Sequence, residues 1–305
     1  MTTNKFGHNS LLNNPKQTIN KNIERKRPIL DRNPQLFENV PLPSWIELSL
    51  IDTCNRSCSF CPKSNEDIAP NTNNKIQRPL IDKLYKDLNK INYKGAFSFC
   101  GYGEPLLYKD LEYLTKTLGE LGPIEIVTNG DTLNKNKLSY LHNLKISKLV
   151  ISMYDGPEQI IKFNDMIKES KVPEDFIILR DRWYSDKIDY GVKLTNRTGT
   201  VIVGNQPDVK NYKNSKCFYT AYQVLIDWNG DFFLCPQDWN RRVSMGNLMQ
   251  KSFFDIWSGN MLTKFRRKLL SGSRDISPCN KCNADGTVHG HKHAIAWSNF
   301  YKIKK

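Results

Sequence analysis

The segment "CNRSCSFCP", residues 54–62, places Cys54, Cys58 and Cys61 in one short loop that closes on a proline. A structural zinc site is closed by four ligands, and four thiolates also fill the irons of an ordinary four-iron cluster. Three thiolates leave one iron without a protein ligand. The spacing therefore predicts an iron-sulfur cluster with one position open to an exchangeable ligand.

The composition predicts a globular, cytoplasmic protein. A chain of 305 residues is long enough for one large domain and a smaller one. The start, "MTTNKFGHNSLLNNPK", has no apolar core typical of a signal peptide, and no run of about 18 apolar residues follows, so we expect no membrane segment. In a reducing compartment, the eight cysteines favour metal binding over disulfides.

The formal charge of +14 raises the question of a nucleic-acid partner. Lysine and asparagine are frequent throughout the chain, which favours solvated surface lysines over one phosphate-binding patch. The densest basic run, "ERKRP" at 24–28, lies in a polar stretch, 1–43, without periodicity. We expect that stretch to be an arm or a disordered tail.

The rest of the first two thirds alternates between strand and helix patterns. Strands are expected at 45–51, 96–100, 124–128, 149–152 and 176–180, and helices at 78–91, 109–121, 134–142 and 157–170. Strands separated by such helices form a parallel sheet. The sheet either stays open or curls into a partial barrel over 44–205, with its chemistry at the carboxyl ends of the strands.

Alternation within these strands predicts a polar inner face. If the apolar residues pack on the helices, Glu47, Ser98, Cys100, Ser152 and Arg180 point inward. Such a face suits a polar substrate, and it equally suits a network of polar side chains that satisfy one another.

The C-x-x-x-C-x-x-C loop after the first strand resembles the radical S-adenosylmethionine (SAM) superfamily. The resemblance implies a partial (β/α)6-type barrel and a four-iron cluster held by Cys54, Cys58 and Cys61. In that family SAM chelates the open iron and is cleaved reductively to a 5'-deoxyadenosyl radical, which abstracts hydrogen from the substrate. It also implies an electron donor such as flavodoxin or ferredoxin.

Further motifs match this family. "GYGEP", residues 101–105, resembles its G-G-E-P motif, in which the glutamate holds the SAM amino group, and here a tyrosine replaces the second glycine. An aromatic residue precedes the third cysteine, and "TNG" follows the third strand. The SAM contacts that the resemblance implies are Phe60, Gly101, Tyr102, Gly103, Glu104, Pro105, Thr128, Asn129, Ser152 and Arg180.

Four more cysteines, Cys217, Cys235, Cys279 and Cys282, lie in the C-terminal segment, 206–305. The stretch "VLIDWNGDFFLC" predicts a hairpin that turns at Asn229-Gly230. Four thiolates can hold zinc. Behind such a barrel, however, they resemble the twitch form of the SPASM domain, which implies one auxiliary four-iron cluster.

A fully ligated auxiliary cluster has no vacancy for substrate, which favours electron transfer and net oxidation. The sequence resembles the aminocyclitol dehydrogenases among twitch enzymes, and this resemblance implies oxidation of an alcohol of a sugar-like or cyclitol-like small molecule. Arg197 lies about where such relatives place a substrate-contacting arginine. A role as base is secondary, because the pKa of arginine is high.

Other functions remain open. Cys100 is either a hydrogen-atom donor in an epimerisation or a buried structural cysteine. Peptide modification is another radical reaction, although 1–43 is too polar and short for a convincing leader-binding domain. A function other than an enzyme is also open, namely a zinc or iron-sulfur module that binds RNA. That interpretation does not explain the motifs "GYGEP" and "TNG".

Two late segments carry structural expectations. The histidines of "HGHKH", His289, His291 and His293, either chelate a metal or form a solvated or hydrogen-bonded strand edge. Residues 254–270 predict one packing helix whose basic residues face outward.

Overall fold

A computed structural model describes residues 23–156, 158–182, 194–202 and 206–303. The strands are β1 (Leu36–Phe37), β2 (Val40–Pro41), β3 (Trp45–Leu48), β4 (Ala96–Phe99), β5 (Ile124–Thr128), β6 (Lys148–Met153), β7 (Ile177–Asp181), β8 (Gln223–Ile226), β9 (Asp231–Phe233) and β10 (Ser244–Asn247). The helices are α3 (Arg27–Leu30), α4 (Arg78–Lys90), α5 (Leu111–Gly119), α6 (Lys135–Asn143), α7 (Glu158–Ser170), α8 (Tyr219–Tyr222), α9 (Phe253–Trp257), α10 (Asn260–Leu270) and α11 (His291–Phe300). None of the described helices is long and apolar enough to cross a membrane.

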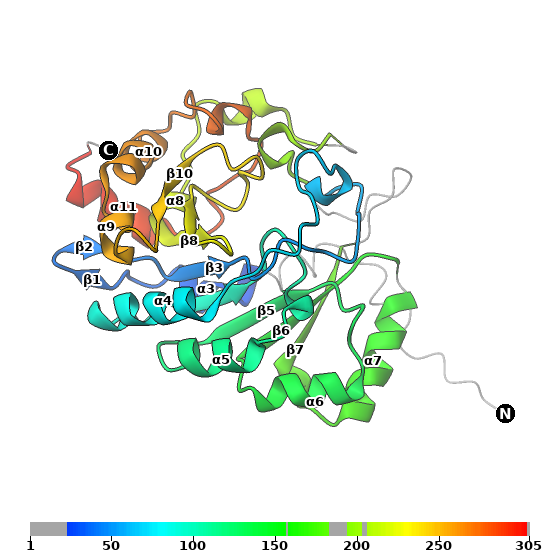
Figure 1. The fold of residues 1–305 in the computed structure, drawn as a ribbon. Coiled ribbons are helices and arrows are strands. Elements are labelled where there is room, and N and C mark those ends of the chain that lie inside the picture. The colour runs from blue at the N-terminus through cyan, green and yellow to red at the C-terminus, as the bar shows by residue number, and fades with distance from the viewer. Residues whose placement is uncertain (1–22, 157, 183–193, 203–205, 304–305) are drawn as a thin grey trace.

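The α/β fold class is confirmed. Strands β3 to β7 are parallel, each pairing with the next, and helices α4 to α7 alternate with them. Figure 1 shows these helices along one side of the sheet. The first of them, α4, has Pro79 in its first turn, where the missing N–H costs no hydrogen bond. Its residues Leu80, Leu84 and Leu88 are buried at helical spacing, which explains why the periodicity located it.

The C-terminal segment continues the same sheet. Strand β8 lies parallel to β3, and β9 and β10 follow in antiparallel order, so the strand order is β10-β9-β8-β3-β4-β5-β6-β7. The expected hairpin joins β8 to β9, and Gly230 in its turn has a φ of 88°. Residues on both sides of the expected domain boundary near 205 thus share one set of backbone hydrogen bonds.

The described part of the N-terminal stretch is packed, so of the two expectations, an arm or a disordered tail, residues 23–43 form an ordered arm. Helix α3 buries Leu30, and the β1–β2 hairpin leads to the buried Leu42. Asp31 accepts a hydrogen bond from the backbone N–H of Gly290, 2.8 Å away. This segment is therefore held against the C-terminal part of the chain, and residues 1–22 lie outside the described ranges.

The expected helix over 254–270 is wrong in two respects. It is two helices, α9 and α10, separated at Gly259, where an added Cβ would come within 2.8 Å of the carbonyl oxygen of Asp255. Not all its basic residues face outward, because Arg266 is fully buried and donates to the carbonyl oxygens of Thr220 and Trp257. The aromatic rings beside the guanidinium explain this burial.

The histidines of "HGHKH" do not form a strand edge. Gly290, with a φ of 82°, precedes helix α11, which begins at His291. His293 is fully buried, its Nε2 lies 2.8 Å from Ser44 Oγ, and burial lowers its pKa to about 4. His289 pairs with Asp31. The two buried histidines thus have separate structural partners.

Candidate active site

A cavity of about 420 Å³ opens at the carboxyl ends of the parallel strands. Glu47, Ser98, Cys100 and Arg180 line it, as the strand alternation predicted. Ser152 is fully buried behind Arg180, whose guanidinium donates to Ser152 Oγ at 2.6 Å. Arg180 therefore presents its side chain to the cavity in place of Ser152.

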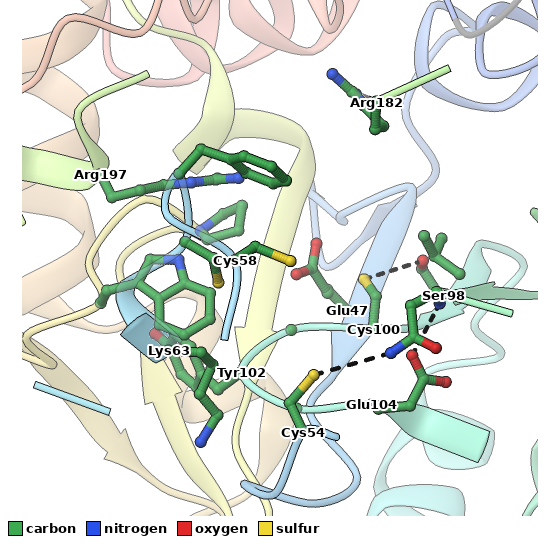
Figure 2. Close-up of a pocket in the computed structure, with 18 of the residues that line it drawn as sticks. Glu47, Cys54, Cys58, Lys63, Ser98, Cys100, Tyr102, Glu104, Arg182 and Arg197 are labelled. Atoms are coloured by element: carbon green, nitrogen blue, oxygen red, sulfur yellow. Dashed lines mark hydrogen bonds between the residues drawn. The ribbon is translucent and has the colours of Figure 1, made fainter. Parts of the chain in front are cut away.

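Cys54, Cys58 and Cys61 line one wall of this cavity, and Figure 2 shows Cys54 and Cys58 beside it. The loop is closed by a hydrogen bond from Cys61 N–H to the carbonyl oxygen of Cys58, 2.9 Å long. Cys54 N–H donates to Asn71 Oδ1 at 3.0 Å. All three residues are partly exposed, so a group bound to them would face the cavity.

Arg56, inside the cysteine loop, ties it to two strand ends. Its guanidinium donates to Asp131 after β5 and to Asp155 after β6, in both cases through two nitrogens. Paired donation of this kind fixes direction as well as distance. The sequence contained this arginine in "CNRSC", but its partners come from distant loops.

The three thiols fit a metal cluster chemically. Burial raises the pKa of Cys54 and Cys61 and raises the pKa of Cys58 to about 11. Metal ligation requires thiolates, and bound iron would supply the missing positive charge. Among the described residues no three His, Cys, Asp or Glu side chains converge as a single-ion site. The three thiols on the open wall nevertheless suit a larger group, such as a cluster.

Glu104 of "GYGEP" is held rigidly at the cavity edge. Its Oε1 accepts from Thr128 Oγ1 at 2.6 Å and from Leu106 N–H at 3.0 Å, and its Oε2 accepts from Asn129 N–H at 2.9 Å. Burial raises its pKa, and these hydrogen bonds oppose that change. Gly103 is required for this approach, since an added Cβ would lie 2.1 Å from the carbonyl oxygen of Ile51.

Tyr102, the departure from the family motif, joins the barrel to the C-terminal segment. Its hydroxyl donates to the carbonyl oxygen of Asp238 at 3.0 Å, and its ring packs on Trp239 with centroids 4.7 Å apart. Gly101 takes the left-handed backbone, with a φ of 104°, beside Ser49. The tyrosine thus leaves Glu104 in place while adding a contact between distant segments.

The aromatic residue of the cysteine loop has a partner that sequence reasoning missed. Phe60 and Tyr154 both line the cavity, with ring centroids 5.4 Å apart. Thr128 and Asn129 line the same space, whereas Pro105 starts the short 3-10 helix η2 (Pro105–Leu107) outside the lining. The expected SAM contacts thus gather here, apart from Pro105 and Ser152.

The two expected catalytic residues lie on opposite sides of the cavity (Figure 2). Arg197, in the short 3-10 helix η4 (Arg197–Gly199), donates from Nη1 to Gln237 Oε1 at 3.4 Å. Cys100 Sγ lies 3.4 Å from Ser98 Oγ and borders Glu47. Burial raises the pKa of both Cys100 and Glu47, which favours the protonated thiol and a more basic carboxylate.

The auxiliary cysteines line a second, much smaller cavity of about 20 Å³. The cavity is lined by all four of them, Cys217, Cys235, Cys279 and Cys282. Cys279 is the first residue of the short 3-10 helix η6 (Cys279–Lys281), and Cys282 directly follows this helix. Burial first, and neighbouring thiols next, raise the pKa of Cys235. An added Cβ at Gly286 would approach Cys217 Sγ to 2.5 Å, so the glycine keeps this thiol cradle clear.

The two cavities share part of their walls. Tyr219 and Gln237 line both of them. Tyr219 precedes β8, so the strand that extends the sheet also fixes the side chain between the sites. One layer of side chains therefore separates the space beside the cysteine loop from the four-cysteine cradle.

Several lining residues were missed because only the fold brings them here. Arg25 and Lys26 come from the N-terminal stretch, Arg182 follows β7, and Tyr219 precedes β8. The "ERKRP" run was the only sequence feature that drew attention to Arg25 and Lys26, and its charge alone did not predict that they line this cavity.

Comparison with known families agrees with this geometry. Residues 48–178 match the radical SAM superfamily model, and residues 217–283 match the SPASM iron-sulfur cluster-binding domain. These two domains imply four-iron clusters. The matched ranges include all eight cysteines that line the two cavities, and neither includes the first 47 residues.

The chain is also similar to named proteins. It is 30% identical over 246 residues to an S-adenosyl-L-methionine-dependent 2-deoxy-scyllo-inosamine dehydrogenase of Niallia circulans, covering 79% of this chain and 92% of the relative. The crystal structure of BtrN in complex with AdoMet and 2-DOIA superposes with a TM-score of 0.71 at 26% identity, over 84% of this chain and 98% of that one. Native anSMEcpe with bound AdoMet shares the fold, with a TM-score of 0.52 at 15% identity, over 85% and 96% of the two chains.

The cysteine loop, the parallel strands behind it and the C-terminal cysteine cradle all agree with these similarities. The chain belongs to the radical SAM superfamily and carries a C-terminal iron-sulfur cluster-binding domain of the SPASM type.

Proposed function

We propose that this radical SAM enzyme oxidises an alcohol of a polyhydroxylated small molecule to a ketone. The observation that supports this most is the shared wall between the two cysteine cavities. A substrate in the larger cavity would lie between a site that starts radical chemistry and one that accepts an electron. The dehydrogenase named among the relatives agrees with this reaction class.

In this proposal the two cysteine sets hold different clusters. Cys54, Cys58 and Cys61 would hold the SAM-binding cluster, and the four cysteines of the smaller cavity would hold the auxiliary one. When bound, the cofactors supply hydrogen-atom abstraction and take up one electron. Glu104 would receive the SAM amino group, and Phe60 with Tyr154 would flank the adenine.

The remaining step, loss of the hydroxyl proton, falls to residues of the chain. Glu47 is better suited than Arg197, because burial raises the pKa of its carboxyl and makes the carboxylate a stronger acceptor. Arg197 would orient the substrate from the opposite side. Removal of a hydrogen atom, a proton and an electron converts the alcohol to a ketone.

The test is anaerobic turnover of the reconstituted protein with SAM, a reductant and a panel of polyols. Flavodoxin or ferredoxin would be the physiological electron donor. We expect 5'-deoxyadenosine and ketone in equal amounts. A complete lack of 5'-deoxyadenosine with every polyol, in protein that holds both clusters, would contradict the proposal.

A second candidate, epimerisation, is favoured by one observation, the cavity-facing thiol of Cys100. Burial keeps this thiol protonated by raising its pKa, so it is able to donate a hydrogen atom, and one electron from a cluster with one proton would then restore the thiol. Turnover in deuterated water distinguishes the two reactions. An inverted alcohol with solvent deuterium at carbon, lost in Cys100→Ala, would replace the dehydrogenase proposal.

A further inference from the structure

The N-terminal segment places two cations in the wall of the larger cavity, which is the proposed substrate site. Arg25 and Lys26, just before and at the start of helix α3, both line it. They lie outside the ranges that match the two family models. Lys26 Nζ lies 4.7 Å from the centre of the ring of Trp45, the first residue of β3.

Arg25 is buried without enough hydrogen-bond partners. Its side chain is only 8% exposed, and its Nη1 lies 3.0 Å from Glu125 Oε2. Nevertheless its three guanidinium nitrogens have no hydrogen-bond acceptor in the part of the chain that the structure describes, and Glu125 Oε1 has no donor there. A buried guanidinium with unused donors is costly, so these donors are available to a ligand with acceptor oxygens.

Cations outnumber carboxylates among the described side chains that line this cavity. Arg56 is paired with two aspartates, and Lys63 donates to two backbone carbonyl oxygens, so both are neutralised or occupied. Glu47 and Glu104 are the carboxylates among the described residues of the cavity wall, and three donors already occupy Glu104. Arg25, whose Nη1 lies 3.0 Å from Glu125 Oε2, lines the same wall, as do Lys26, Arg180, Arg182 and Arg197.

We propose that the substrate carries an oxyanion group, a phosphate or a carboxylate, which Arg25 and Lys26 bind. Guanidinium and ammonium groups recognise both through charge-assisted hydrogen bonds. The named relative acts on an inosamine, as its name states, and a protonated amine would be repelled here. The inference deepens the proposed function by naming the substrate class, and it rests on that function.

The test is binding to the holoenzyme with SAM and without reductant, so that no turnover occurs. The probes are myo-inositol, its 1-phosphate, the carboxylated cyclitol quinate, and an inosamine. We expect at least one anionic probe to bind ten times more tightly than both myo-inositol and the inosamine, a difference of about 1.4 kcal/mol. The phosphate and carboxylate arms identify which oxyanion is bound.

Arg25→Gln and Lys26→Gln should each weaken that probe about tenfold, whereas the neighbouring exposed Arg27→Gln should leave its affinity unchanged. SAM affinity should stay constant in all three. The inference is overturned if neither anionic probe exceeds the neutral one, if Arg27→Gln has the same effect, or if SAM affinity falls in parallel. If Arg25→Gln does not fold, wild-type selectivity and Lys26→Gln decide.

Separate measurement of 5'-deoxyadenosine keeps the two proposals distinguishable. Oxyanion selectivity without any SAM cleavage would remove the proposed reaction and leave the binding site. Ketone formation from myo-inositol or the inosamine, without oxyanion selectivity, would do the reverse.

Discussion

The two cysteine sites differ in the space around them. Cys54, Cys58 and Cys61 are partly exposed on the wall of a cavity of about 420 Å³. The four auxiliary cysteines, of which two are buried and two partly exposed, line a space of only about 20 Å³. The open site has room for an exchangeable ligand, and the closed site does not. This difference supports the proposed roles, ligand chemistry at the first site and electron transfer at the second.

The largest expected effect is loss of one site without the other. Cys58→Ala should reduce 5'-deoxyadenosine formation to background, because the open cluster loses a ligand. Cys279→Ala should leave some SAM cleavage and abolish ketone formation, because the electron acceptor is lost. Each variant should fall from about eight irons per chain to about four. Equal loss of 5'-deoxyadenosine in both would break the proposed division of roles.

The arginines beside the two sites should differ next. Arg274 is only 2% exposed and donates to the backbone carbonyl oxygens of Ser215, Lys216, Ala284 and Asp285. Arg274→Gln leaves buried carbonyls unpaired and should lower the free energy of unfolding by about 3 kcal/mol.

Arg56→Gln is the matched comparison at the open site. Its side chain is 17% exposed and its two partner carboxylates are 25% and 55% exposed, so the expected loss is about 1 to 2 kcal/mol, smaller than for Arg274→Gln. Anaerobic denaturation of the two holoproteins, with iron content, checks both values. A larger loss for Arg56→Gln would show that the stability of the protein depends more on the cysteine loop of the open site than on the cradle of the closed site.

Within the open site, Glu104→Gln should weaken SAM binding about ten- to a hundredfold. The amide lacks the negative charge and brings a donor toward groups that already donate to this side chain. Equilibrium dialysis with labelled SAM measures the change, and the exposed Glu112→Gln is the control. Unchanged affinity, with both clusters present, would exclude Glu104 as the amino-group ligand.

Local patterns account for what the sequence predicted. The cysteine spacing, the strand that contains Glu47 and the helix that contains Pro79 each depend on residues close in the chain, and each was located closely. The placement of Glu104 at the cavity followed from its motif and its strand end.

Long-range packing accounts for what was missed. Lys26 reaches the cavity only because helix α3 packs on the barrel, and His293 is buried only because α11 lies against Ser44. Similarly, the charge of Arg266 indicated a position on the exposed face of its helix, and only the aromatic rings around its guanidinium explain its burial. Charge and periodicity do not specify such partners.

The smallest expected effect concerns the link between the two sites. Tyr102→Phe removes the hydroxyl that donates to the carbonyl oxygen of Asp238 at 3.0 Å and keeps the packing on Trp239. The loss of one buried hydrogen bond should cost about 1 kcal/mol, seen as a lower denaturation midpoint of the holoprotein. Tyr85→Phe is the control, because its hydroxyl bonds to Glu120 at the surface. Equal midpoints for the two variants would mean that the hydroxyl of Tyr102 adds no stability to the junction, which would then depend on aromatic packing alone.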